Sequence, residues 1–228
     1  MSKKILIYTE GKSDRNFLGW YLSFLECKNH FECKNHFDVF DIEGKDKLIS
    51  DEFLEKIDKI LNNKHQTYKQ VCIIFDADKK ESQESDVGFD NKLKYICKEL
   101  KEKRIDFPRE QIFLFPNNQD DGDLEDLLLE IANHKEFINC FESYLDCIKK
   151  KKHYKPIKNI RKSKWYAYLE ALGLENLYTK KNIFDTEGKV KDQYKGDYEK
   201  LQEVIGFDSK SLVPLKNFLE RFVENNQK

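Results

Sequence analysis

The sequence predicts an α/β protein with a mainly parallel, four-stranded sheet flanked by helices and followed by a helical C-terminal part. Two observations lead to this prediction. In the first half of the chain, four short runs rich in aliphatic and aromatic residues alternate with segments of helical periodicity. After residue 124 the strand pattern nearly vanishes, and apolar residues recur at helical spacing. Strands that alternate with helices favour a parallel sheet with right-handed crossovers.

The predicted strands lie in the first half of the chain, and helices separate them. The run VCIIF is continuously apolar, as expected of a strand covered on both faces. A first helix is predicted from Ser13, a plausible N-cap, through Leu25. Two more helices are predicted over residues 51–62 and Lys92–Lys103. The four predicted strands are Lys4–Thr9, Phe37–Ile42, Val71–Phe75 and Gln111–Phe115.

The second half is predicted to be helical. We place a boundary near residue 135, with an α/β domain over residues 1–135 and a helical region over residues 136–228 packed on it. No linker composition separates the two parts, so a shared core is expected. The helices predicted here are Leu124–Asn133, Glu136–Lys149, Lys164–Leu172 and Leu212–Asn225.

Composition excludes several classes of protein. The 228 residues are 36% charged and 13% aromatic, which is typical of a folded domain with a charged surface and not of a disordered chain. We see no apolar run long enough to span a bilayer and no signal or transit peptide. A cytoplasmic protein without a membrane partner is therefore expected, with its six cysteines reduced.

A tandem repeat stands out, because residues 26–31 and 32–37 both read ECKNHF. The repeat sets cysteines and histidines at three-residue intervals. A zinc site is one interpretation, but structural zinc sites usually pair ligands across a longer loop. A local duplication between a helix and a strand explains the pattern without a metal. The four residues concerned are Cys27, His30, Cys33 and His36.

Acidic residues follow three of the four predicted strands. In an open parallel sheet, ligands bind outside the carboxyl ends of the strands, so these acids are expected to converge at one edge. Crowded carboxylates repel one another, and a hard divalent cation such as Mg²⁺ (or Mn²⁺) relieves that repulsion. Two such ions could clamp a phosphodiester. The candidate ligands are Glu10 and Asp14 after the first strand, Asp76 and Asp78 after the third, and Asp123, Glu125 and Asp126 after the fourth.

Each acidic group also has a plain structural interpretation. Glu10 with Gly11 is a turn, and an acid such as Asp14 in a first helical turn is favoured by capping and the helix dipole. The run DGDLEDLL, residues 121–128, could be an acidic helix start. Their coincidence at one sheet edge favours the metal-site interpretation.

A basic run, KKKKHYKPIKNIRKSK over residues 149–164, holds nine Lys or Arg and no acid. Such a run is often a solvated surface. Alternatively, it is a strip that contacts nucleic-acid phosphates, with Tyr154 available to stack on a base. DNA is the expected partner ahead of RNA. The candidate nucleic-acid contacts are Lys12, Lys150, Lys152, Tyr154, Lys158, Arg161 and Lys162.

These motifs resemble those of topoisomerase–primase (Toprim) domains, which carry a Glu-Gly after one strand and an Asp-x-Asp after a later one. EGKSDRNFL and GDLEDLL are similar to the branch of Toprim nucleases named for overcoming lysogenization defect (OLD). More closely, EGKSD, FDAD, FPNNQDDGDLEDLL and KSKWYAYLEAL together resemble the DUF3226 family over nearly the whole chain.

The resemblance implies a Mg²⁺-dependent site with Glu10, Asp14, Asp76 and Asp78 as ligands. It also implies a second metal position with Glu125 and Asp126 as ligands. It implies that Lys164 or Lys162 lies beside the reacting phosphate. The residues assigned as catalytic are Glu10, Asp76, Asp78 and Lys164. OLD nucleases carry an ATPase domain, but this chain has no GxxxxGK[ST] loop.

The expected function is metal-dependent hydrolysis of nucleic-acid phosphodiesters, by the protein alone or with a separate ATPase. Phage defence and DNA repair are the roles considered for such a nuclease. Two alternatives stay open. The chain could be a non-catalytic module that binds metal and nucleotide or nucleic acid beside a separate ATPase. It could also be an interaction protein whose acids form a turn-rich surface.

Overall fold

At the centre of the protein lies a parallel sheet, which confirms the predicted fold class. A computed structural model describes residues 3–27, 36–44, 47–48, 50–79, 87–153, 157, 159–179 and 190–224. Within them four strands pair in the order β2-β1-β3-β4, and every pairing is parallel. The strands are β1 (Lys4–Thr9), β2 (Phe37–Asp41), β3 (Tyr68–Asp76) and β4 (Ile112–Phe115).

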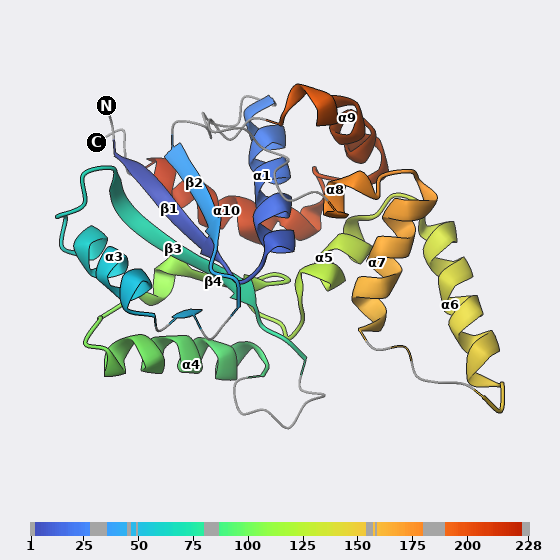
Figure 1. The fold of residues 1–228 in the computed structure, drawn as a ribbon, viewed down its shortest axis with the longest axis horizontal. Coiled ribbons are helices and arrows are strands. Elements are labelled where there is room, and N and C mark those ends of the chain that lie inside the picture. The colour runs from blue at the N-terminus through green and yellow to red at the C-terminus, as the bar shows by residue number, and fades with distance from the viewer. Residues whose placement is uncertain are drawn as a thin grey trace.

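Helices cover both faces of the sheet, as side-chain alternation along the strands requires. Leu6, Ile73 and Leu114 point to the face covered by α3 (Asp51–Leu61) and α4 (Phe89–Glu102). Their strand neighbours point to the opposite face, which is covered by α1 (Lys12–Cys27) and the C-terminal helices. Figure 1 shows this layered arrangement, with α3 and α4 on one side of the strands.

The C-terminal helices share a core with the sheet. Phe113 on β4 meets Phe218 on α10 with ring centroids 5.3 Å apart, and the Tyr198 hydroxyl donates to the Trp20 carbonyl at 2.9 Å. Residues on both sides of position 135 therefore pack together. The helices of this part are α5 (Leu124–Ile131), α6 (Lys135–Lys149), α7 (Ile160–Ala171), α8 (Asn176–Thr179), α9 (Lys195–Val204) and α10 (Val213–Glu224), with 3₁₀ turns at Arg109–Gln111, Asp192–Tyr194 and Lys210–Leu212.

The structure corrects three predicted helix starts. α4 begins at Phe89, three residues before the predicted start at Lys92. α1 begins at Lys12, so Ser13 is not its N-cap, and the Asp14 side chain instead accepts the Gly11 N–H. α7 begins at Ile160, four residues before the predicted start at Lys164.

In the described part of the chain, no helix is long and apolar enough to cross a membrane. The described thiols that are free are Cys72, Cys97, Cys140 and Cys147.

Candidate functional site

Two acidic strand ends flank the point where the strand order reverses. β2 lies on one side of β1 and β3 on the other, so the strand order reverses between β1 and β3, at a topological switch point. Open parallel sheets bind their ligands outside the carboxyl ends of the strands at such a point. Glu10 directly follows β1, and Asp76 is the last residue of β3. The predicted convergence of these strand ends is present in the fold.

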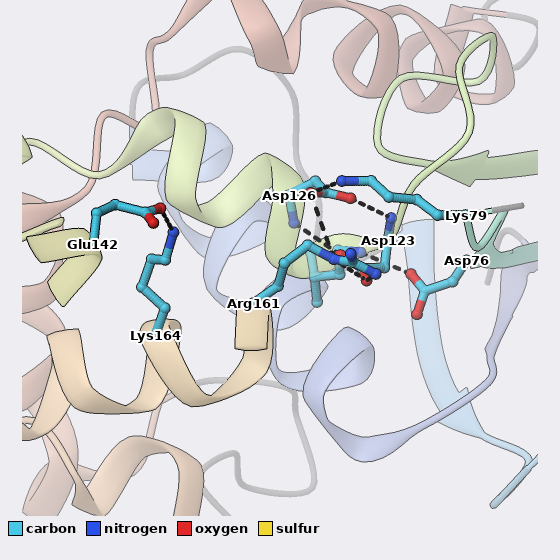
Figure 2. Close-up of polar contacts among 8 residues, drawn as sticks. Asp76, Lys79, Asp123, Asp126, Glu142, Arg161 and Lys164 are labelled. Carbon is cyan, nitrogen blue, oxygen red and sulfur yellow. Dashed lines mark hydrogen bonds and ion pairs between the residues drawn. The ribbon is translucent and has the colours of Figure 1, made fainter. Parts of the chain in front are cut away.

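Asp76 lies at the centre of the site. Its Oδ1 accepts the Leu124 N–H at 2.8 Å, so it faces the N-terminus of α5, as Figure 2 shows. The partial positive charge of a helix N-terminus stabilises such a carboxylate. Burial nevertheless raises the pKa of Asp76 well above its usual range, and four neighbouring acids raise it further. We call Asp76 and these four acids the acidic cluster: Glu10, Asp14, Asp76, Asp123 and Glu125.

Asp14 is held inside the protein on the first turn of α1. Its side chain is 6% exposed, and Oδ2 accepts the Gly11 N–H at 2.8 Å. Burial raises the pKa of Asp14 to about 7; the Gly11 hydrogen bond opposes this shift, and Glu125 and Glu10 add to it. Near neutral pH this group is therefore divided between its protonated and charged forms.

Glu125 and Lys162 bring opposite charges to the same place from different helices. Glu125 on α5 is buried, and burial and the nearby Asp123 raise its pKa while Lys162 lowers it. For Lys162 on α7, burial lowers the pKa, but Tyr166, Glu125 and Asp14 outweigh it and the net shift is upward. Lys162 is therefore a cation that acts directly on the acidic cluster.

A capping box and two cations fix the start of α5. Asp123 Oδ1 accepts the Asp126 N–H at 2.9 Å, and Asp126 Oδ2 accepts the Asp123 N–H at 3.1 Å. Arg161 on α7 donates its Nε–H to Asp123 Oδ2 at 2.8 Å, and Lys79 donates to Asp126 Oδ1 at 2.7 Å. Figure 2 shows both cations converging on this pair of aspartates. Sequence reasoning missed Lys79, although it directly follows the DAD motif.

Asp78 does not join the acidic cluster. β3 ends at Asp76, and Asp78 lies beyond it with a left-handed φ of 60°, so the two carboxylates do not share one face of a strand. Asp78 Oδ2 instead lies 2.7 Å from Nζ of Lys92, which is 1% exposed on α4. In this structure Asp78 neutralises a buried lysine.

Lys164 also lies away from the acidic cluster. Its ammonium group pairs with Glu142 on α6, while Arg161, one turn earlier on α7, points to Asp123 (Figure 2). Of the two lysines that the resemblance implied for the phosphate, the structure brings Lys162 to the acids.

Three of the remaining predicted contacts lie among the described residues. Lys12, Lys150 and Lys152 are exposed. Tyr154 and Lys158 lie outside the described residues, as does most of the ECKNHF repeat.

The chemistry of the acidic cluster fits a hard divalent cation, since every ligand atom is a carboxylate oxygen. The present side-chain positions do not form a chelating group. Among the described residues, no three His, Cys, Asp or Glu side chains are arranged so that they could hold a metal ion. Asp14 and Asp76 accept backbone N–H groups, and Asp123 binds Arg161. Binding a cation would draw carboxylates away from these contacts.

Comparison with known proteins gives one match. A family model described as "Protein of unknown function (DUF3226)" matches residues 3–224. Neither a curated protein nor a solved structure matches the chain.

Proposed function

The chain belongs to the DUF3226 family, and from its site we propose that it is a divalent-cation-dependent phosphodiesterase that acts on nucleic acid. The observation that carries this proposal is the acidic cluster at the carboxyl ends of β1 and β3. The resemblance of EGKSD and FDAD to Toprim motifs supports the same assignment.

A structural role alone does not account for two buried and three partly buried acids in one place. Burial and mutual repulsion raise the pKa of Asp14, Asp76 and Glu125 together, so without a cation the cluster lowers the stability of the fold at neutral pH. Perturbed carboxylates of this kind gather at functional sites. A bound Mg²⁺ or Mn²⁺ would supply Lewis-acid charge to a phosphoryl oxygen and to an attacking water.

The side chains take distinct roles in this proposal. Asp14, Asp76 and Glu125 hold the cation. Glu10, whose charge acts on Asp76, accepts a proton from the attacking water. Lys162 faces the charge that builds on the phosphate, as expected of a cation fixed beside the reacting group. Asp123 and Asp126 have a supporting part, because together with Arg161 and Lys79 they hold the start of α5.

A cleavage assay tests the proposal. Plasmid, linear duplex and single-stranded substrates are incubated with Mg²⁺ or Mn²⁺ and with wild type, Asp76→Asn or Glu10→Gln. We expect metal-dependent cleavage that each substitution lowers by more than about 100-fold, since even indirect partners of a metal ligand are worth about 10–100-fold. Asp106→Asn, which changes an exposed acid outside the acidic cluster, is the matched control and retains activity. Equal activity of Asp76→Asn and wild type would refute the proposal.

One observation favours a second candidate function, a module that binds nucleic acid without turnover. Two residues that the resemblance implied for chemistry, Asp78 and Lys164, form ion pairs with Lys92 and Glu142. If the chain is such a module, nucleic acid binds as tightly in EDTA as in Mg²⁺ or Mn²⁺, and neither metal produces cleavage.

A further inference from the structure

One face of α6 is apolar in sequence but only partly covered: Phe137 packs against Tyr168 of α7, whereas Tyr144 is exposed. Phe137, Phe141, Tyr144 and Ile148 recur at spacings of four, three and four residues, the period of a buried helix face. Among the residues of α6, only Leu145 is fully buried. Tyr144 is 53% exposed, and its ring centroid lies 6.0 Å from that of the partly exposed Phe141.

A group of lysines continues from this aromatic pair. Lys150, Lys151 and Lys152 are exposed at the C-terminal end of α6. Of the three acids of α6, Glu136 lies in its first turn, Glu142 pairs with Lys164 of α7, and Asp146 lies 3.7 Å from Lys149. The exposed Tyr144 lies about two helical turns before these lysines along the chain.

The end of α6 and the start of α7, which serves the acidic cluster, lie at the same end of the two helices. Figure 1 shows α6 and α7 as a helical hairpin, with the last turn of α6 and the first turn of α7 at the same end. Arg161 and Lys162, in that first turn of α7, contact or act on the acids. The lysines of α6 thus extend the positive charge of α7 away from the acidic cluster.

We propose that the α6 end of this hairpin is a docking surface for single-stranded nucleic acid, on which Tyr144 stacks against an unpaired base and Lys150, Lys151 and Lys152 contact phosphates. This inference rests on the proposed function and specifies that its substrate is single-stranded nucleic acid. An aromatic ring beside a lysine group matches a chain of alternating bases and phosphates. A duplex offers no free base face to Tyr144. A protein partner fits less well, because lysine is depleted from protein–protein interfaces.

Binding without cleavage tests the inference. Fluorescence anisotropy in EDTA measures the Kd of labelled single strands of about 16 nucleotides, as DNA and RNA, and of the matching duplex. We expect single strands to bind more tightly than the duplex. Tyr144→Ala should weaken binding about tenfold, the loss of one base stack. Tyr144→Phe keeps the ring and should bind like wild type. Phe40→Ala, which removes an exposed ring on β2, is the control and should change nothing.

The lysines are tested by salt dependence. Replacing Lys150, Lys151 and Lys152 together by Gln should reduce the slope of log Kd against log salt by about 2. The matched control replaces Lys94, Lys101 and Lys103, exposed on α4 or just beyond its end, and should leave the slope unchanged.

Two results would overturn the inference. In the first, wild type and Tyr144→Ala bind single strands with equal affinity. In the second, Tyr144→Ala changes the sedimentation of the protein but not its binding of single strands. The latter would mean that a second copy covers this face. Asp106→Asn, outside the acidic cluster, should bind like wild type in EDTA. If single strands bind through Tyr144 but Mn²⁺ never produces cleavage, the inference stands and the proposed function fails.

Discussion

At the scale of single residues, Asp14 shows how the acidic cluster lowers the stability of the folded protein. The group is almost fully buried, and its pKa rises from 3.8 to about 7. Between these two values the folded state keeps a proton that the unfolded state has already released. The free energy of unfolding therefore falls as pH rises through this window, and the contribution of Asp14 is lost above about pH 7.

Asp14→Asn should remove part of this pH dependence. In EDTA we expect the Tm of wild type to fall as pH rises from about 5 to about 7.5, because Asp14 ionises in a buried site beside Glu10 and Glu125. The Asn variant carries no charge, can still accept the Gly11 N–H, and should show a shallower fall. Thermal melts followed by circular dichroism across this pH range provide the measurement. Parallel pH profiles for the two proteins would contradict the assigned burial.

Residue positions were predictable where they depend on strand ends. Glu10 and Asp76 follow apolar runs, and parallel strands bring such positions to one edge. Asp78 and Lys164 were not predictable in this way. Their partners, Lys92 and Glu142, come from other helices, and which side chain reaches which depends on how those helices are rotated and packed.

At the scale of elements, the loops after β3 and β4 hold each other in place. The Gly122 N–H donates to the Asp78 carbonyl at 3.0 Å, and Gly122 has a φ of +153°. A Cβ at this position would lie 2.8 Å from Asp126 Oδ2 and 3.0 Å from Pro116 Cδ. Glycine is therefore required where the acidic loop passes the capping box of α5.

Gly122→Ala should destabilise the protein by about 2 kcal/mol, because the methyl group would push Asp126 away from the capping box and strain the backbone. The corresponding fall in Tm is about 5 °C. Gly196→Ala is the control: a Cβ at that position would have no atom within 4 Å, and alanine favours the helix α9. A Gly122→Ala protein as stable as wild type would show that this loop adapts freely.

Elements with strong patterns were predicted, and helices with a weak pattern were missed or misplaced. The apolar runs of β1, β3 and β4 stand out because both faces of these strands are buried. α9 has only ten residues, with Tyr198, Leu201 and Val204 buried, and so gives a weak periodic signal. The start of α7 at Ile160 lies within the basic run, where no apolar stripe marks a helix.

At the scale of the whole molecule, the site draws on both halves of the chain. The ends of β1 and β3, the first turn of α1 and the start of α5 supply the carboxylates, whereas α7 supplies Arg161 and Lys162. The near-zero net charge of −1 conceals this separation of charge. Both regions are recognisable in the sequence, but only the fold shows that they meet.

The most direct test of this account is a calorimetric titration of the metal-free protein with Mn²⁺. We predict binding to wild type that Asp76→Asn and Glu125→Gln each weaken by about tenfold or more, with Asp106→Asn unchanged. Wild type that releases no heat of binding, or variants that bind Mn²⁺ as tightly as wild type, would contradict the claim that the acidic cluster is a cation site.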